Sequence, residues 1–275
     1  MTLLLALCMP SAMAACLQWG KLGPLQNTSE SLIYIGTLGN RNIRMRLHLD
    51  SATGRMDGAY GYNNEPGTLK LVGYMLKDHS GMELVELDNK GNRTGFFDLS
   101  FMPPSSFLGS GDPATEGHEA FEKQWNSDEY GECESMLGVW MTSSRPGTSA
   151  KAVVLQGGIA FDPTKERSVR IQNEATAYAF MQAVIHNDRK KVVSLLQYPF
   201  HSYDQAPGHQ GDRTWKTPED VLRNYAEIVQ FEPKFVRNWV PHFLVTNRGA
   251  SGLGDTVVLH DGKITWICAG ECPAF

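Results

Sequence analysis

Apolar and polar residues alternate in short runs between residues 32 and 155, and turn residues separate the runs. In the clearest run, 43–49, every second residue is apolar and the residues between them are Arg44, Arg46 and His48. Such alternation predicts a β-strand with one buried and one solvated face. Further strands are expected at 32–36, 56–62, 69–74, 82–87, 95–101, 136–141 and 152–155. Because few helices can fit between them, we expect an all-β antiparallel meander that closes into a barrel and so protects its edges.

The segment 103–131 interrupts this pattern with a helix expected at 116–125 and with many acidic residues. We interpret it as a helical insertion that decorates the barrel, and a functional lid is the alternative. Its acidic patch would suit a basic protein partner. The N-terminal β-barrel-like domain is then expected at 16–157, followed by a linker at 158–169.

Beyond residue 170 the apolar spacing becomes helical. Helices are expected at 175–187, 189–197 and 217–230, the last with Thr217 as N-cap and Pro218 at its first position. Strands are expected at 243–245, 255–259 and 263–267, with a hairpin turn at Asp261 and Gly262. Helices followed by an antiparallel sheet predict an α+β domain at 170–275.

Residues 1–15 have the pattern of a signal peptide. An apolar run at 3–9 is followed by Ala12 and Ala14 at the spacing that a signal peptidase reads. We therefore expect a periplasmic or secreted protein, and a buried N-terminal helix is the alternative. The stretch from Met13 to Cys16 also resembles a lipobox, so lipidation of Cys16 would make the protein a membrane-anchored lipoprotein.

Removal of residues 1–15 leaves the cysteines Cys16, Cys133, Cys268 and Cys272. An even number of cysteines in an oxidising compartment predicts disulfides, with three possible pairings. A local Cys268–Cys272 bond is geometrically plausible and would leave Cys16 with Cys133. A metal site at Cys268 and Cys272 is the alternative, but no second Cys/His pair has matching spacing, so we expect no metal.

The second half resembles the cone-shaped α+β domains of the nuclear-transport-factor-2-like superfamily. The resemblance rests on residues 179–184, 187–188, 192–200 and 215–220 and on the hairpin at 261–264. It implies a pocket between a curved sheet and the helices, in which an acid–base pair can act. The candidates for that pocket are His201, Tyr203, Trp215, Trp239 and His242. Alternatively, the aromatic residues fill the cone and the histidines make structural hydrogen bonds.

The first half resembles small β-rich domains of exported bacterial proteins. The matching residues are 34–37, Tyr-Ile-Gly-Thr, and 57–60, Asp-Gly-Ala-Tyr. This resemblance implies an envelope location and a binding or inhibitory role.

The net charge of −5 argues against a nucleic-acid partner. Nucleophile elbow, P-loop and dinucleotide motifs are absent from the sequence, so we expect no cofactor and leave the catalytic residues unassigned. Arg44, Arg46 and His48 form a one-sided ladder that could meet an acidic partner, and a solvated strand face is the alternative. We expect a non-catalytic envelope protein that binds a protein or a small-molecule ligand, and an inhibitor or immunity-type protein fits this description. The alternatives are a hydrolase or isomerase that uses the C-terminal pocket and a lipoprotein scaffold.

Overall fold

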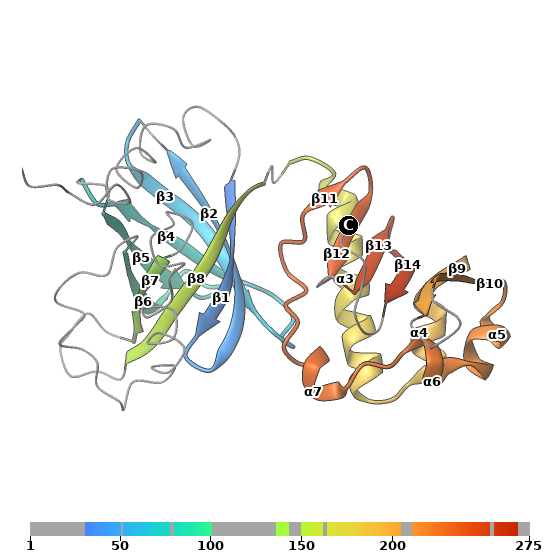
Figure 1. Cartoon of the computed structure of the whole chain (residues 1–275). Helices are drawn as coiled ribbons and strands as arrows, with labels where there is room; N and C mark the ends of the chain where they lie inside the picture. The colour runs from blue at the N-terminus through green and yellow to red at the C-terminus, as the bar shows by residue number, and fades with distance from the viewer. Residues whose placement is uncertain are drawn as a thin grey trace, which may run out of the picture. The chain divides into compact units, whose positions relative to one another are not determined.

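The computed structural model describes residues 31–50, 52–77, 80–100, 136–142, 150–161, 164–204, 211–253 and 256–268. The chain divides into two compact units, drawn from blue to red along the sequence in Figure 1. The first unit contains the N-terminal strands. The second contains the described residues from 164 onward, together with residues 42–44 and 61–68.

The first unit is a closed barrel in which each strand is hydrogen-bonded to the next and β8 pairs antiparallel with β1. Its strands are β1 (Ser31–Leu38), β2 (Arg41–Asp50), β3 (Arg55–Tyr62), β4 (Leu69–Met75), β5 (Gly81–Leu87), β6 (Arg93–Ser100), β7 (Met136–Met141) and β8 (Ala150–Phe161). The antiparallel barrel expected for this part of the chain is confirmed for the described strands. The predicted insertion helix at 116–125 lies outside the described residues.

The alternation of residue types determines which side chains fill the barrel. In β2, Ile43, Met45 and Leu47 are buried, whereas the residues between them are partly exposed. Large fully buried side chains from other strands complete the interior, among them Tyr34, Tyr60, Leu71, Leu84 and Phe97. The barrel is therefore filled with side chains, as expected for eight strands.

Close approach of strands β4 and β5 requires a glycine at position 73. A Cβ atom on Gly73 would lie 1.9 Å from the carbonyl oxygen of Glu83. Any larger residue would push these two strands apart, so the backbone path on this side of the barrel depends on Gly73.

Strand β8 continues to Phe161 and helix α3 (Arg167–Ile185) begins soon afterwards. Only residues 162–166 therefore separate these two elements, whereas the sequence suggested a linker at 158–169.

The second unit combines helices with a six-stranded sheet of order β10-β9-β14-β13-β12-β11. Its helices after α3 are α4 (Arg189–Leu195), α5 (Pro218–Arg223), α6 (Tyr225–Ile228) and α7 (Pro233–Val236). Its strands are β9 (Leu196–Asp204), β10 (Gly211–Trp215), β11 (Thr246–Asn247), β12 (Ala250–Leu253), β13 (Val257–His260) and β14 (Lys263–Cys268).

This sheet is mixed, which corrects the expectation of a purely antiparallel one. Strand β14 pairs in parallel with β9, and the other pairs are antiparallel. Parallel pairing needs a long connection, and the chain between β9 and β14 supplies one that contains α5, α6 and α7.

Two further predictions for the second unit need correction. The helix expected at 217–230 is interrupted at Asn224, although Thr217 caps it and forms a capping box with Asp220 as its residues suggest. The strand expected at 243–245 is absent, because Phe243 has a φ of 50° and the chain turns there before β11 begins.

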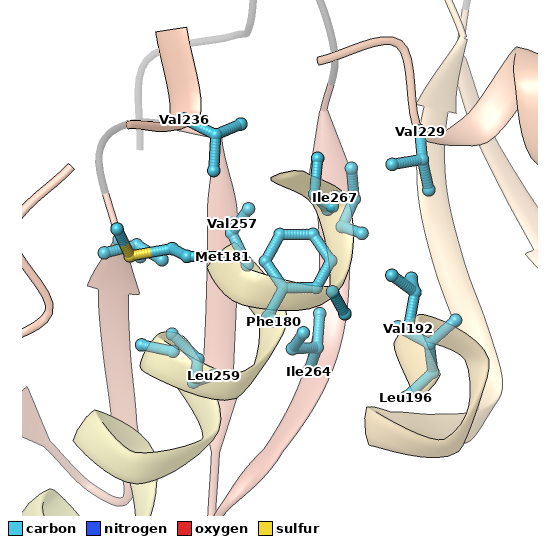
Figure 2. Packing of buried hydrophobic residues seen from close by; sticks show 14 of the residues in the cluster. Phe180, Met181, Val192, Leu196, Val229, Val236, Val257, Leu259, Ile264 and Ile267 are labelled. Atoms are coloured by element: carbon cyan, nitrogen blue, oxygen red, sulfur yellow. The ribbon is translucent and has the colours of Figure 1, made fainter. Parts of the chain in front are cut away.

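Phe180 of α3 lies at the centre of the second hydrophobic core. Figure 2 shows its ring facing Val257, Ile264 and Ile267 of the sheet, with Val192 of α4 nearby. All four of these side chains and Phe180 are essentially inaccessible to solvent. The space between the sheet and the helices is thus filled with apolar side chains at this level.

A candidate binding groove on the barrel

A groove crosses the outer face of the barrel over strands β2 to β6. Its volume is about 530 Å³, and its lining includes His48, Asp50, Arg55, Met56, Asp57, Val72, Gly73, Tyr74, Glu83, Val85 and Phe96. A volume of this size lies within the range of roughly 300–1,000 Å³ that is typical of ligand sites. All of the lining residues belong to the first unit.

Strand register arranges the outward side chains of the groove in two parallel rows. Arg55 lies opposite Tyr74, Tyr74 opposite Glu83, and Glu83 opposite Asp98. We call these four residues the acidic row. Directly opposed side chains on one sheet face approach to about 5 Å and interact across the strands.

The neighbouring row is mostly apolar. Asp57 lies opposite Val72, Val72 opposite Val85, and Val85 opposite Phe96. We call Val72, Val85 and Phe96 the apolar row. The guanidinium of Arg93 lies 5.6 Å from the centre of the Phe96 ring and covers one end of this row.

The charges of the groove are unevenly compensated. Asp57 forms an ion pair with Arg46 at 3.9 Å. In contrast, Glu83 and Asp98 face each other, and the structure gives neither of them an ion pair among the described residues. Burial raises the pKa of Asp98, and the neighbouring charge of Glu83 raises it further. Carboxylates therefore dominate this end of the acidic row, where Glu83 lines the groove and Asp98 lies next to it on the neighbouring strand.

The three residues predicted as a partner surface lie in different settings. His48 lines the groove, and Arg46 is engaged by Asp57. Arg44 belongs to the second unit, where its Nη1 donates a hydrogen bond to the carbonyl oxygen of His242 at 3.2 Å. Burial lowers the pKa of Arg44 to about 10, although the charge of Glu174 opposes this shift. Only His48 and Arg46 are therefore near the groove.

Each of the residues predicted for the C-terminal pocket makes contacts of its own. His201 is exposed on β9, and its Nδ1 lies 3.2 Å from the Oγ1 of Thr214. Tyr203, two residues further on the same strand, is partly buried. Trp215 instead donates a hydrogen bond to the Oγ of Ser202 at 2.8 Å.

Trp239 belongs to the hydrophobic core of the second unit, and Trp215 packs against the same core. The Trp239 ring packs edge-to-face against Phe231 and Phe235, at centroid distances of 5.1 and 5.6 Å. The Nε2 of His242 lies 2.8 Å from the carbonyl oxygen of Glu65. Burial lowers the pKa of His242, so the neutral imidazole is favoured. These contacts agree with structural roles for both side chains.

A buried polar cluster occupies the interior of the barrel. The carboxylate of Glu86 accepts hydrogen bonds from the Tyr60 hydroxyl at 2.5 Å, the Thr94 hydroxyl at 2.6 Å and the Trp140 indole N–H at 2.9 Å. Glu86 is only 4% exposed. Three donors satisfy its buried carboxyl oxygens, so we assign this cluster a structural role.

Of the cysteines predicted to form disulfides, the structure describes only Cys268, which is buried at the end of β14. The pairings of Cys16, Cys133 and Cys272 remain predictions because these residues lie outside the described ranges. Within the described ranges, no group of three His, Cys, Asp or Glu residues could hold a metal ion. No helix of the described chain has the length and apolarity needed to cross a membrane.

Comparison with family models, curated proteins and solved structures finds no match to this chain.

The groove is a site that sequence reasoning did not identify. Alternation assigns Val72, Tyr74, Val85 and Phe96 to the outward face, where polar residues are the norm in a solvated antiparallel sheet. That departure from the norm was a usable signal. The alignment of these residues in adjacent rows depended on strand register, which the sequence pattern does not provide.

Proposed function

We propose that this protein is a non-catalytic binding module that binds a protein partner through the groove of its barrel. The observation that carries this proposal is the apolar row together with the neighbouring Tyr74. Tyr74 is 61% exposed. Placing apolar groups outward on a sheet leaves them in water, and contiguous exposed apolar surface marks interaction sites.

The length of the two rows suits a protein segment. Adjacent strands lie about 4.8 Å apart, so the acidic row, which spans β3 to β6, is roughly 15 Å long, and the apolar row, which spans β4 to β6, is roughly 10 Å long. A chain segment lying across the strands could contact the residues of both rows in turn.

The proposed location is the cell envelope. The signal-like residues 1–15 and the resemblance of residues 34–37 and 57–60 to exported β-rich domains support it. An inhibitor or immunity-type protein fits a binding module in this compartment. Lipidation of Cys16 remains the alternative to a soluble form.

Affinity capture with matched variants tests the proposal. The mature wild-type protein, Tyr74→Ala and Ile35→Ala would each be immobilised and exposed to envelope extract, and the bound proteins would be quantified by mass spectrometry. Ile35 is a suitable control because it is an exposed apolar residue, 44% accessible, on β1 and does not line the groove.

We expect a protein that binds to wild type and to Ile35→Ala but is lost with Tyr74→Ala. Truncating an exposed aromatic anchor at an interface typically costs about 2 kcal/mol or more, which is more than ten-fold in affinity. A partner that both variants bind equally well would show that the binding surface lies outside the groove. Recovery of no specific partner by wild type would argue against a protein-binding role.

A further inference from the structure

We propose that the partner presents a lysine or arginine side chain to Glu83 and Asp98 in the acidic row. This inference rests on the proposed function, because it specifies the chemistry of a partner that binds in the groove. It depends on three features: the facing carboxylates, the aromatic ring beside them and the charges around them.

The facing carboxylates leave a charge imbalance on the barrel surface. Glu83 of β5 and Asp98 of β6 are directly opposed and point outward on the same sheet face. Like charges in this position destabilise a sheet. A cation placed between them would relieve the repulsion and stabilise both ionised groups, so its binding would gain more than at an isolated carboxylate.

The side chains adjacent to Glu83 suit the rest of a long basic residue. Tyr74 lies directly opposite Glu83 on its other side, and its exposed ring can accept an ammonium or guanidinium group over its face. The apolar row lies two residues further along the same strands, where Val85 and Val72 can contact the aliphatic stem. The apolar surface and the acidic groups are thus arranged as a lysine or arginine side chain requires.

The remaining charges of the groove do not cancel the acidic row. Arg46 is paired with Asp57, and Arg93 lies over Phe96 at the end of the apolar row. Arg55 is at the opposite end of the acidic row, separated from Glu83 by Tyr74. A hydroxyl hydrogen bond from Thr53 lowers the pKa of Asp50, so this residue adds a further negative charge to the groove. These observations favour a cationic partner over the acidic one suggested by the ladder in β2.

Selection from a random peptide display library tests the inference directly, because it requires no identified partner. Immobilised wild type, Glu83→Gln, Tyr74→Ala and Glu219→Gln would be used for parallel selections. Glu219→Gln is the matched control, because it removes the same charge from an exposed residue of α5 in the other unit. Urea denaturation of each variant establishes that it is folded, and Glu83→Gln should be no less stable than wild type because it removes a like-charge contact.

We expect peptides selected on wild type and on Glu219→Gln to share a lysine or arginine at one position, and this preference to disappear on Glu83→Gln. In a selected peptide that carries arginine at this position, replacing the arginine by citrulline should weaken binding to wild type at least about ten-fold. This is at the low end of the coupling energies measured for charge pairs at interfaces. The same replacement should have little effect on binding to Glu83→Gln.

Three other results would overturn the inference, and the first of them separates it from the proposed function. Selected peptides that need Tyr74 but show no preference for lysine or arginine would support the groove as a binding site and would show that its partner is not recognised by a basic side chain. Selected peptides that bind Tyr74→Ala and Glu83→Gln as well as wild type would reject both proposals. A basic preference that Glu219→Gln also abolishes would indicate general attraction to a negatively charged protein.

Discussion

At the scale of single residues, Glu86 gives the clearest test of how the barrel interior is stabilised. Glu86→Ala would remove the acceptor of three hydrogen bonds, from Tyr60, Thr94 and the Trp140 indole, and the loss of a buried hydrogen bond costs about 1–3 kcal/mol. We expect a loss of about 2–4 kcal/mol in the free energy of unfolding, measured by urea denaturation. Glu83→Ala, on the same strand but facing outward, should change it by less than about 0.5 kcal/mol. Equal effects of the two substitutions would contradict the assigned role.

Glu174 should make stability depend on pH. Burial raises the pKa of Glu174 from 4.5 to about 6, although a hydrogen bond from the Leu244 N–H and the charge of Arg170 oppose this shift. Between pH 4.5 and about 6 the folded protein therefore binds more protons than the unfolded chain. The free energy of unfolding falls as the pH rises through this window, and the full loss of stability is reached above it. The shift corresponds to about 2 kcal/mol.

Glu174→Gln keeps an acceptor for the Leu244 N–H but cannot ionise. Relative to this variant, wild type should lose about 2 kcal/mol of stability between pH 4.5 and pH 7, as measured by urea denaturation at several pH values. Glu219→Gln should give a curve parallel to that of wild type, because its side chain is exposed. Parallel curves for wild type and Glu174→Gln would show that Glu174 titrates normally in the folded state.

At the scale of elements, Asn173 joins helix α3 to two turns of the sheet. Its Nδ2 donates to the carbonyl oxygen of Gly249 at 3.1 Å, and its Oδ1 accepts from the Gly262 N–H at 2.7 Å. Asn173→Ala should cost about 2–4 kcal/mol because the Gly262 N–H loses its acceptor in a buried site and the Gly249 carbonyl keeps only the hydrogen bond from the Asp261 N–H. The Gly262 amide should also exchange with solvent faster, as measured by hydrogen exchange. Gln172→Ala, an exposed amide on the same helix, is the control and should leave both quantities nearly unchanged.

The sequence predicted elements well where one pattern repeats and poorly where pairing partners are distant. Period-two alternation located all eight barrel strands, because burial of one face dictates every second residue. It missed β10 (Gly211–Trp215), which has few apolar residues, and β12 (Ala250–Leu253), whose glycines resembled a turn. The parallel pairing of β14 with β9 joins segments about sixty residues apart, so no local signal could reveal it.

The candidate sites were also predictable only where the residues belong to one strand. His48 and Arg46 were recognised as outward-facing residues of one strand, and they lie beside the groove. The residues that define the groove come from β3, β4, β5 and β6, and only the register of four strands brings Tyr74, Glu83 and Asp98 into one row. The pocket candidates were selected by resemblance to a fold, and their separate contacts follow from packing that the resemblance does not specify.

At the scale of the whole molecule, each compact unit has a hydrophobic interior of its own. Leu84 is fully buried in the barrel, and Phe180 is fully buried in the second unit. Because the two interiors are separate, we expect two transitions in differential scanning calorimetry. Leu84→Ala should lower one transition and Phe180→Ala the other, each by an amount that corresponds to about 3–5 kcal/mol of lost stability. A single transition that both substitutions lower equally would show that the two units unfold as one cooperative structure.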